Sequence, residues 1–323
     1  MLTYIPFNNF LTNENSHSVI CLGNFDGVHI GHARLVSETI FMKQQYRNKK
    51  VRACAMCFSP FPVDYFSKSP VKHLMSIDEK LDVFRSMGLD GVYICDFSKI
   101  YMLSPDAFIS NVLLDACNCI GVICGFNYRF GCKASGTPED LKSRFLNLND
   151  GDFKMVDPVK LDEMTVSSSL IKSNLENGNI DLVNKMLGRP FSLSHDVVHG
   201  KSLGTKLGFP TINYVFSESD AIPSFGIYVT ITNIDGKCYK SVTNVGIRPT
   251  VADGESITCE THILDCDTGS NFYDLRAKVH FLSKIRDEKR FNSIEELSSA
   301  ISSDVNHAKE FFESHKEYKY FNL

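Results

Sequence analysis

Two histidines lie three residues apart in a short stretch rich in glycine, GNFDGVHIGH, which runs from Gly23 to His32. Glycines let backbone N–H groups approach a phosphate closely, and His29 and His32 can converge on one ligand across a helical turn. A helix that starts near Gly31 would add free N–H groups and a partial positive charge. Spacing alone leaves a phosphate-binding turn and a plain glycine-rich turn equally open. It disfavours a metal pair, because no third ligand follows at a recognisable spacing.

A second glycine-rich stretch, VVHGKSLGTKLGFPTINY, covers residues 197–214. Its glycines predict a loop that can fold over phosphates, and a short strand follows. Thr211 and Asn213 lie two residues apart on that strand, so they share a face and offer neutral oxygen ligands that suit Mg²⁺ when ATP phosphates supply the rest. A glycine-rich turn before an ordinary strand is the plain alternative.

Three consecutive serines, Ser167, Ser168 and Ser169, stand at the start of another predicted helix. Hydroxyl and backbone N–H groups at a helix start can hold a phosphate. A simple N-cap explains the same serines without any ligand.

Length and charge narrow the class of protein. At 323 residues, the chain exceeds the size at which one hydrophobic core usually keeps growing, so we expect two domains. The 34 basic and 38 acidic residues are well mixed, which argues against nucleic acid and anionic membrane as partners. No apolar run approaches the roughly 18–20 residues that span a bilayer, and the start MLTYIPFNNF does not resemble a signal peptide. We expect a cytoplasmic protein.

Eleven cysteines are scattered along the chain. Cys54 and Cys57 have the spacing of a redox or zinc pair, but they lie in an apolar run that predicts a buried strand. Alternation along that strand would point the two thiols to opposite faces, and no second pair follows at a finger-like spacing. Reduced, buried cysteines in a cytosolic protein are the better interpretation.

In the first half of the chain, predicted strands alternate with predicted helices, and these elements must position the residues above. Apolar runs predict strands at 18–22, 51–58, 91–97, 121–125 and about 153–159. Helices are expected over about 32–46 and 76–87, and after Ser104 and Thr137; Ser76 and Glu79 form a capping box, and prolines occupy two first helical positions. This alternation predicts a doubly wound parallel sheet, with the Gly23–His32 stretch at the carboxyl end of a strand, where ligands bind.

The pattern changes near Gly188, where a helix over 180–187 is expected to end. Beyond it, residues 226–246 predict a hairpin with a tight turn at Asp235 and Gly236, and residues 256–265 and 273–282 alternate apolar and polar side chains. Apolar steps from Ile294 to Phe312 predict a terminal helix. We expect domains over 1–184 and 185–323, the second an antiparallel β-barrel or sandwich with a packed helix.

The motifs resemble one family. FDGVHIGH is similar to the H-x-G-H signature of nucleotidyltransferases in its flavin form, G-x-F-D-G-x-H-x-G-H. Further stretches resemble the bacterial bifunctional riboflavin kinase/FMN adenylyltransferases (FAD synthetases): CFSPFP (57–62), GFNYRFG (125–131), KASGT (133–137) and TVSSSLI (165–171). In the second half, LGFPTIN (207–213), NVGIRPT (244–250) and CETHILD (259–265) resemble the flavokinase signatures. The resemblance runs nearly end to end, with several motifs in the right order.

The resemblance implies a Rossmann-like N-terminal domain in which the FMN phosphate attacks the α-phosphorus of ATP, giving FAD and pyrophosphate. No protein nucleophile is required, so catalysis consists of positioning and neutralisation of charge. His29 and His32 would bind the ATP phosphates, and Asn127 and Arg129 would lie on the flavin side. The remaining ATP-binding positions would be Gly23, Phe25, Asp26, Gly27, Gly31, Ser167, Ser168 and Ser169.

For the C-terminal barrel, the resemblance implies riboflavin kinase activity with Glu260 as the general base. Glu260 would take the proton from the riboflavin 5′-hydroxyl as this group attacks the γ-phosphate of ATP. On its strand pattern alone, Glu260 would more often be a solvated residue. Thr211 and Asn213 would hold Mg²⁺, and Arg286 would lie on the flavin side. The ATP-binding positions would be Gly200, Gly204, Lys206, Gly208, Thr211 and Asn213.

Four positions depart from the family pattern. Phe61 replaces a histidine, Lys172 and Thr205 replace arginines, and Asp274 replaces a glycine. Lys172 keeps the charge of arginine but loses its bidentate fork. These departures bear on affinity and rate more than on the type of reaction.

We therefore expect an enzyme that makes FMN and then FAD with ATP and Mg²⁺, at two separate sites. Its partners would be riboflavin, FMN and ATP, without nucleic acid or membrane, and it would be a monomer or a weak homo-oligomer. A chain with only one live activity is one alternative, given Phe61 and Thr205. A flavin-binding module without turnover is the other, but pure binding would not need a base such as Glu260.

Overall fold

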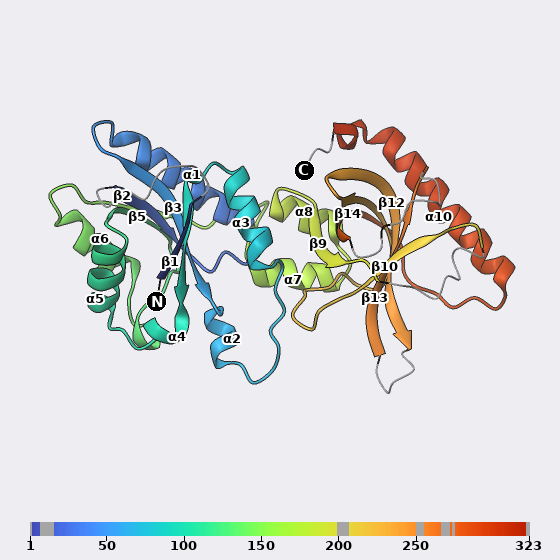
Figure 1. Ribbon diagram of the computed structural model, residues 1–323, viewed down its shortest axis with the longest axis horizontal. Coiled ribbons are helices and arrows are strands. Elements are labelled where there is room, and N and C mark those ends of the chain that lie inside the picture. The colour runs from blue at the N-terminus through green and yellow to red at the C-terminus, as the bar shows by residue number, and fades with distance from the viewer. Residues whose placement is uncertain are drawn as a thin grey trace. The chain divides into compact units, whose positions relative to one another are not determined.

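The computed structural model describes residues 2–6, 16–198, 207–249, 255–265, 272 and 275–320. The chain forms two compact units, Met1–Ser168 and Ser169–Leu323, and each contains a six-stranded sheet (Figure 1). Helix α7 (Ser168–Glu176) begins at the last residue of the first unit, and α8 (Ile180–Leu187) follows it in the second. A domain boundary after residue 184 stays a prediction.

The first unit contains a mostly parallel sheet in the order β1-β4-β3-β2-β5-β6. Its strands are β1 (Leu2–Pro6), β2 (His17–Leu22), β3 (Val51–Ser59), β4 (Gly91–Asp96), β5 (Cys119–Gly125) and β6 (Asp152–Val156). Strands β2 to β6 pair in parallel, and only β1 is antiparallel to its neighbour. The chain runs outward from β2 through β3 and β4 and then returns to β5 on the other side of β2. This confirms the doubly wound prediction and puts the topological switch point between β2 and β5.

Helices connect these strands. They are α1 (Ile30–Gln45), α2 (Pro62–Phe66), α3 (Ile77–Ser86), α4 (Phe97–Ile100), α5 (Pro105–Ala107), the π-helical η1 (Phe108–Ala116), the short η2 (Cys132–Ala134) and α6 (Pro138–Leu146). Of these, α1, α3, α6 and the helix after Ser104 lie at the predicted places. The capping box of Ser76 and Glu79 is present in full. A small hairpin of β7 (Lys160–Leu161) and β8 (Met164–Thr165) follows β6. The elements that were not predicted from the sequence are β1, α2, α4, η2 and the β7–β8 hairpin, together with the π-helical geometry of η1.

The sheet of the first unit is covered on both faces by hydrophobic clusters. Cys54 packs in the cluster on one face and Cys57 in the cluster on the other, as the alternation along β3 predicts. Burial raises the pKa of Cys54 to about 12 and that of Cys57 to about 11. These thiols are therefore core residues, and the interpretation of CAMC as buried and reduced is confirmed.

The second unit contains an antiparallel sheet in the order β10-β13-β12-β11-β14-β9, which curls into a half-barrel (Figure 1). Its strands are β9 (Phe191–Asp196), β10 (Thr211–Val215), β11 (Gly226–Ile234), β12 (Lys237–Pro249), β13 (Glu255–Ile263) and β14 (Arg276–Arg286). One isolated bridge joins Val198, just beyond β9, to Asn213 of β10, so the two edges of the sheet touch. The predicted tight turn links β11 and β12, with positive φ at Asp235 and Gly236.

The interior of this half-barrel carries hydroxyl groups among its apolar side chains. Five of them are fully buried and hydrogen-bonded to one another across β11, β12 and β13: Thr230, Thr232, Ser241, Thr243 and Thr261. The predicted terminal helix is α10 (Ile294–Ser314), which packs Ala308 and Phe312 onto the sheet. A short η3 (Lys316–Tyr320) follows it.

Candidate active sites

The first candidate site lies at the switch point of the parallel sheet. The Gly23–His32 loop leaves β2 and enters α1, and the loop with Asn127 and Arg129 leaves the neighbouring strand β5. Carboxyl ends of adjacent parallel strands meet at one edge of a sheet, so the topology brings these two sequence-predicted groups together. Asn127 and Arg129 are exposed there.

His29 caps α1 with its side chain. Its Nδ1 accepts hydrogen bonds from the backbone N–H groups of Gly31 (3.1 Å) and His32 (3.3 Å). Because Nδ1 is an acceptor, the neutral ring carries its proton on Nε2, which is the nitrogen that can donate to a phosphate. The His32 ring stacks on the His29 ring, with centroids 3.7 Å apart.

This cap corrects one expectation from the sequence. The first amides of α1 were expected to be free for a phosphate, but those of Gly31 and His32 point at the imidazole of His29. The reason is that His29 lies at the N-cap position, where a side-chain acceptor satisfies the unpaired donors of the first turn. A ligand would therefore meet the imidazole edge rather than these two amides.

The loop holds strained backbone. Phe25 and Val28 both adopt positive φ, at 52° and 39°, although neither is a glycine. The Phe25 side chain is fully buried and packs edge-on against Phe84, which holds the loop in this shape. Non-glycine residues in such conformations cluster at functional sites, because the surroundings must keep them there. Phe25 thus shapes the predicted phosphate loop from the core.

Asp26 connects the loop to two other segments. Its carboxylate accepts the backbone N–H of Leu74 (2.8 Å), and its carbonyl accepts the hydroxyl of Ser168 (2.8 Å). Ser168 is the first residue of α7, preceded by Ser167 and followed by Ser169 in its first turn. The structure therefore places Ser168 beside the Gly23–His32 loop, as the sequence suggested.

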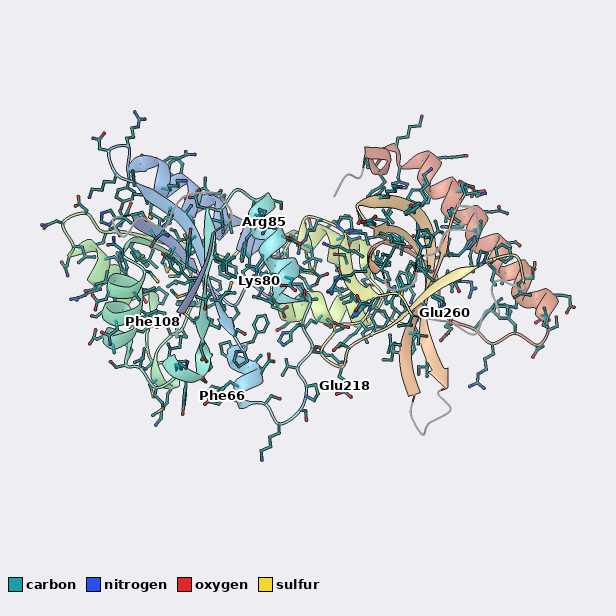
Figure 2. All side chains as sticks on the ribbon, in the orientation of Figure 1. Phe66, Lys80, Arg85, Phe108, Glu218 and Glu260 are labelled. Carbon is teal, nitrogen blue, oxygen red and sulfur yellow. The ribbon has the colours of Figure 1, made fainter. Side chains whose placement is uncertain are left out.

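Aromatic side chains that the sequence analysis missed gather at the same end of the sheet. Tyr65 and Phe66 of α2 contact Phe97 and Tyr101 of the α4 segment, with ring centroids 5.0–6.2 Å apart. Phe66 is 67% exposed (Figure 2). Because α2 follows β3 and α4 follows β4, the cluster lies at the carboxyl edge of these strands. The signal in the sequence was the density of aromatic residues in PVDYF and DFSKIY.

The second candidate site lies on three adjacent strands of the half-barrel. Glu260, labelled in Figure 2, lies on β13. It pairs in register with Asn213 of β10 on one side and with Asn244 of β12 on the other. Residues paired across antiparallel strands point to the same face, so the three polar side chains form a row. Thr211 shares this face because it lies two residues from Asn213. The side-chain amide of Asn213 donates through Nδ2 to the Thr211 carbonyl (3.3 Å).

The remaining predicted kinase residues are placed in part. Gly208 has a φ of 84°, a conformation that favours glycine. Gly200, Gly204 and Lys206 lie outside the described residues, as do the departures Thr205 and Asp274.

Arg286 is held by α10. Its guanidinium donates from Nε (2.9 Å) and Nη2 (2.7 Å) to the two carboxylate oxygens of Asp304, which is buried. A bidentate pair fixes the plane of the guanidinium. Arg286 therefore enters any flavin contact from a fixed orientation.

Family models match both parts of the chain. The family model of FAD synthetases matches residues 11–170, and that of riboflavin kinases matches residues 187–312. The chain belongs to the bifunctional riboflavin kinase/FMN adenylyltransferase family. It is 29% identical to the member from Bacillus subtilis, covering 94% of this chain and 95% of that protein. It is 32% identical to the members from Pseudomonas fluorescens and Escherichia coli K12, covering 91% of this chain and 93% and 92% of those proteins. Its activities are accordingly those of a riboflavin kinase and an FMN adenylyltransferase.

A solved structure has the same fold. A crystal structure described as a macrolide-efflux protein from Streptococcus pneumoniae superimposes with a TM-score of 0.82 at 29% identity, covering 91% of this chain and 94% of that one. That description applies to the other protein. Among the described residues here, no helix has the length and apolarity to cross a membrane.

Proposed function

We propose that this family's two reactions take place at two separate sites, one in each unit. Riboflavin is phosphorylated on the half-barrel, and the resulting FMN is adenylylated at the parallel sheet. The observation that carries this division is that each unit has its own positive-φ glycine loop beside polar side chains. Gly27 precedes His29 in the first unit, and Gly208 precedes Thr211 and Asn213 in the second.

For adenylyl transfer, His29 donates from Nε2 to a phosphate oxygen of ATP, and His32 is stacked beside it. Ser167 and Ser169 add hydroxyl groups, and Ser168 holds the loop by donating its proton to the Asp26 carbonyl. These groups hold the α-phosphorus for attack by the FMN phosphate and offset the charge that builds up on its oxygens. Fixed donors contribute most when they need no rearrangement, and the two backbone hydrogen bonds to Nδ1 fix His29 in this way.

On the flavin side of this site, Asn127 and Arg129 lie on the loop after β5. The cluster of Tyr65, Phe66 and Phe97 offers exposed aromatic faces on which the planar isoalloxazine ring can stack. Arg129 supplies a positive charge for the FMN phosphate.

For the kinase reaction, Glu260 takes the proton of the riboflavin 5′-hydroxyl as that oxygen attacks the γ-phosphate of ATP. Its neighbours in the row are both amides, so no second carboxylate competes there in register. Thr211 and Asn213 would hold Mg²⁺ together with the ATP phosphates. Their neutral oxygens fit a hard cation whose charge is met by the nucleotide, and the bond from Nδ2 of Asn213 leaves Oδ1 as the atom to present. The ion supplies charge neutralisation at the phosphates.

We infer a cytoplasmic enzyme that acts on small molecules as a monomer or a weak homo-oligomer. The support for the compartment is the thiol chemistry. The ten described cysteines are all free, and eight of them are buried.

Two variants test whether the two reactions take place at separate sites. The chain is incubated with Mg-ATP and either riboflavin or FMN, and flavins are separated by chromatography. Glu260→Gln should abolish FMN formation and leave the conversion of FMN to FAD intact. The double variant His29→Ala, His32→Ala should lose FAD formation and keep the kinase step. Loss of both activities in either variant contradicts separate sites, and unchanged FAD synthesis in the double variant removes the histidines from the mechanism.

A further inference from the structure

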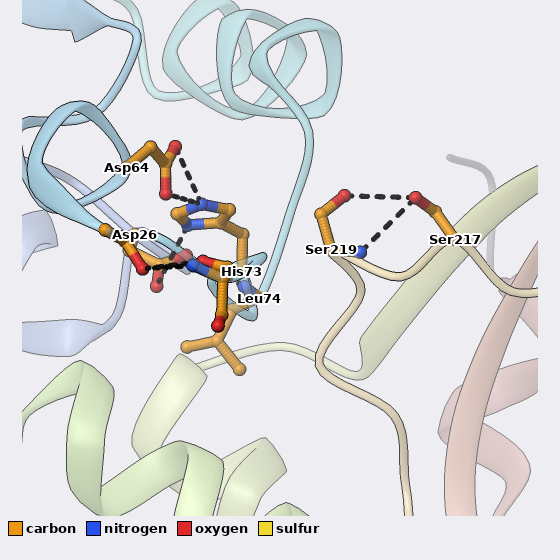
Figure 3. Close-up of polar contacts among 8 residues, drawn as sticks. Asp26, Asp64, His73, Leu74, Ser217 and Ser219 are labelled. Atoms are coloured by element: carbon orange, nitrogen blue, oxygen red, sulfur yellow. Dashed lines mark hydrogen bonds and ion pairs between the residues drawn. The ribbon is translucent and has the colours of Figure 1, made fainter.

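A second histidine site lies behind the Gly23–His32 loop and is not used by the mechanism above. His73 lies in the segment between α2 and α3, and its side chain is 13% exposed. Its Nε2 lies 2.8 Å and 3.0 Å from the two carboxylate oxygens of Asp64, which belongs to α2. Its Nδ1 faces the carboxylate of Asp26 at 4.0 Å (Figure 3). One imidazole thus stands between two carboxylates on different elements.

The surroundings fix the ring in this place. Phe61 stacks on it with nearly parallel planes, at a centroid distance of 4.3 Å. The ammonium of Lys80 lies 4.0 Å from the centre of the Phe61 ring and donates to the carbonyl of Asn24 (3.0 Å). Lys80 is fully buried (Figure 2). The cluster therefore brings together two acidic side chains, one lysine and one imidazole.

Among the described residues, Nδ1 of His73 has no hydrogen-bond partner, and the nearest carboxylate oxygen of Asp26 lies 4.0 Å away, beyond hydrogen-bond distance. The ring is therefore held by Nε2 on Asp64, and its other nitrogen is turned toward Asp26.

The two carboxylates belong to the two sides of the adenylyl-transfer site. Asp26 lies in the loop that carries His29, and the same carboxylate accepts the N–H of Leu74. Asp64 is adjacent in sequence to Tyr65, a member of the aromatic cluster. Any group that joins Asp26 to Asp64 therefore sets the spacing between the ATP loop and helix α2.

We propose that His73 is a positioning residue for adenylyl transfer, which joins α2 to the Gly23–His32 loop. Its Nε2 holds Asp64 of α2, its Nδ1 faces Asp26 at 4.0 Å, and the N–H of the next residue, Leu74, donates to Asp26. Both edges of its ring are turned to carboxylates, so it acts through these elements and does not contact the substrate. Phe61 stacks on one face of the His73 ring and helps to hold it between the two carboxylates.

The test uses the full-length chain, because its kinase reaction reports folding in the same sample. His73→Ala should lower kcat/KM for FMN adenylylation about tenfold or more, mainly through kcat, and leave the kinase constants unchanged. His73→Arg should restore the rate to within about threefold, because a guanidinium donates to two carboxylates at once. The matched control is His17→Ala. His17 is a partly buried histidine that bonds the side chain of Asn118 (3.1 Å) at the opposite end of β2, and its loss should leave both reactions unchanged.

Two results would overturn the proposal: adenylylation at the wild-type rate in His73→Ala, or equal impairment in His73→Ala and His73→Arg. If His73→Ala does not fold, the adenylylation rates of His73→Gln and His73→Arg are compared instead. Glutamine reaches one carboxylate and should be impaired, whereas equal rates in the two variants overturn the proposal. Failure of the function itself is distinguishable, since the wild-type chain would then make no FAD.

Discussion

At the scale of residues, the adenylyl-transfer site depends on how a few side chains are oriented by the backbone. His29 is 7% exposed, and its ring is fixed by two N–H groups of the first turn of α1. Gly31 makes this arrangement possible. A Cβ at position 31 would lie 3.0 Å from Cε1 and 3.1 Å from Nδ1 of His29, tighter than nine in ten real Cβ contacts, so the ring would have to shift by a few tenths of an ångström.

Gly31→Ala should therefore displace the His29 ring and lower the rate of FAD formation about tenfold or more, which corresponds to about 1.4 kcal/mol or more of lost transition-state stabilisation. The same change should keep or raise thermal stability, because alanine favours a helix over glycine by up to about 1 kcal/mol. Steady-state adenylylation and a thermal melt measure the two effects, with the kinase rate of the same sample as the control. A normal adenylylation rate would show that the imidazole has room to move.

At the scale of elements, strands and helices were predictable because their signals are local. The run at 18–22, the capping box of Ser76 and the tight turn at Asp235 each follow from neighbouring residues, and each was found in place. The short elements were missed for the opposite reason. Strand β1 forms by pairing with β4 some 90 residues away, and a five-residue segment such as LTYIP carries no periodicity of its own.

In the candidate sites too, local sequence patterns predicted single residues but not the contacts between distant segments. The motifs pointed to His29 and Glu260, but the row of Asn213, Glu260 and Asn244 depends on the register of three strands. Likewise, the contact of His73 with Asp64 and Asp26 joins residues from three segments. No local pattern states which segments meet, so these neighbours required the fold.

Strand β14 carries a histidine that makes folding sensitive to acid. His280 is 3% exposed, and burial, followed by the charges of Lys278 and Arg189, lowers its pKa to about 3. Its ordinary value is 6.5, so between pH 6.5 and 3 the unfolded chain binds a proton that the folded chain excludes. Stability from this group is present above pH 6.5 and is lost as the pH falls.

The wild-type chain should lose about 2 kcal/mol of unfolding free energy from this group between pH 7 and pH 5. His280→Gln should flatten that part of the pH dependence, as measured by urea unfolding of the second unit at both pH values. His307 lies exposed on α10, and His307→Gln should leave the dependence as in the wild type. An unchanged slope in His280→Gln would mean that the buried ring takes up its proton without unfolding.

At the scale of the whole molecule, the chain hides nearly all of its thiol chemistry. Of the ten described cysteines, only Cys238 is exposed and Cys132 is partly exposed. Burial raises the pKa of the buried thiols, to about 12 for Cys21 and Cys259. The thiolate is the reactive form, so both access and ionisation protect these residues.

A thiol reagent such as Ellman's reagent should therefore react quickly with one thiol of the native Cys266→Ser chain, and slowly with a second. That background removes the one cysteine outside the described residues. Adding Cys238→Ser should abolish the fast phase, and the buried thiols should react only on unfolding in urea. Fast reaction of three or more thiols in the native chain would contradict the core as described.

The hydrogen bonds among the buried hydroxyl groups of the half-barrel can all run in one donor-to-acceptor direction. Ser241 can give its only proton to the carbonyl of Thr230 (3.1 Å), and in that arrangement it accepts from the hydroxyls of Thr230 and Thr232. Thr230 has then used its proton and must accept from Thr243, which in turn accepts from Thr261. In this arrangement, the carbonyl of Thr230 determines the donor–acceptor direction of every hydrogen bond in the hydroxyl network. Threonine and valine have similar shapes, but they are not interchangeable at position 230. A valine there would replace the hydroxyl with a methyl group and would leave the buried hydroxyls of Ser241 and Thr243 each without one hydrogen-bond partner.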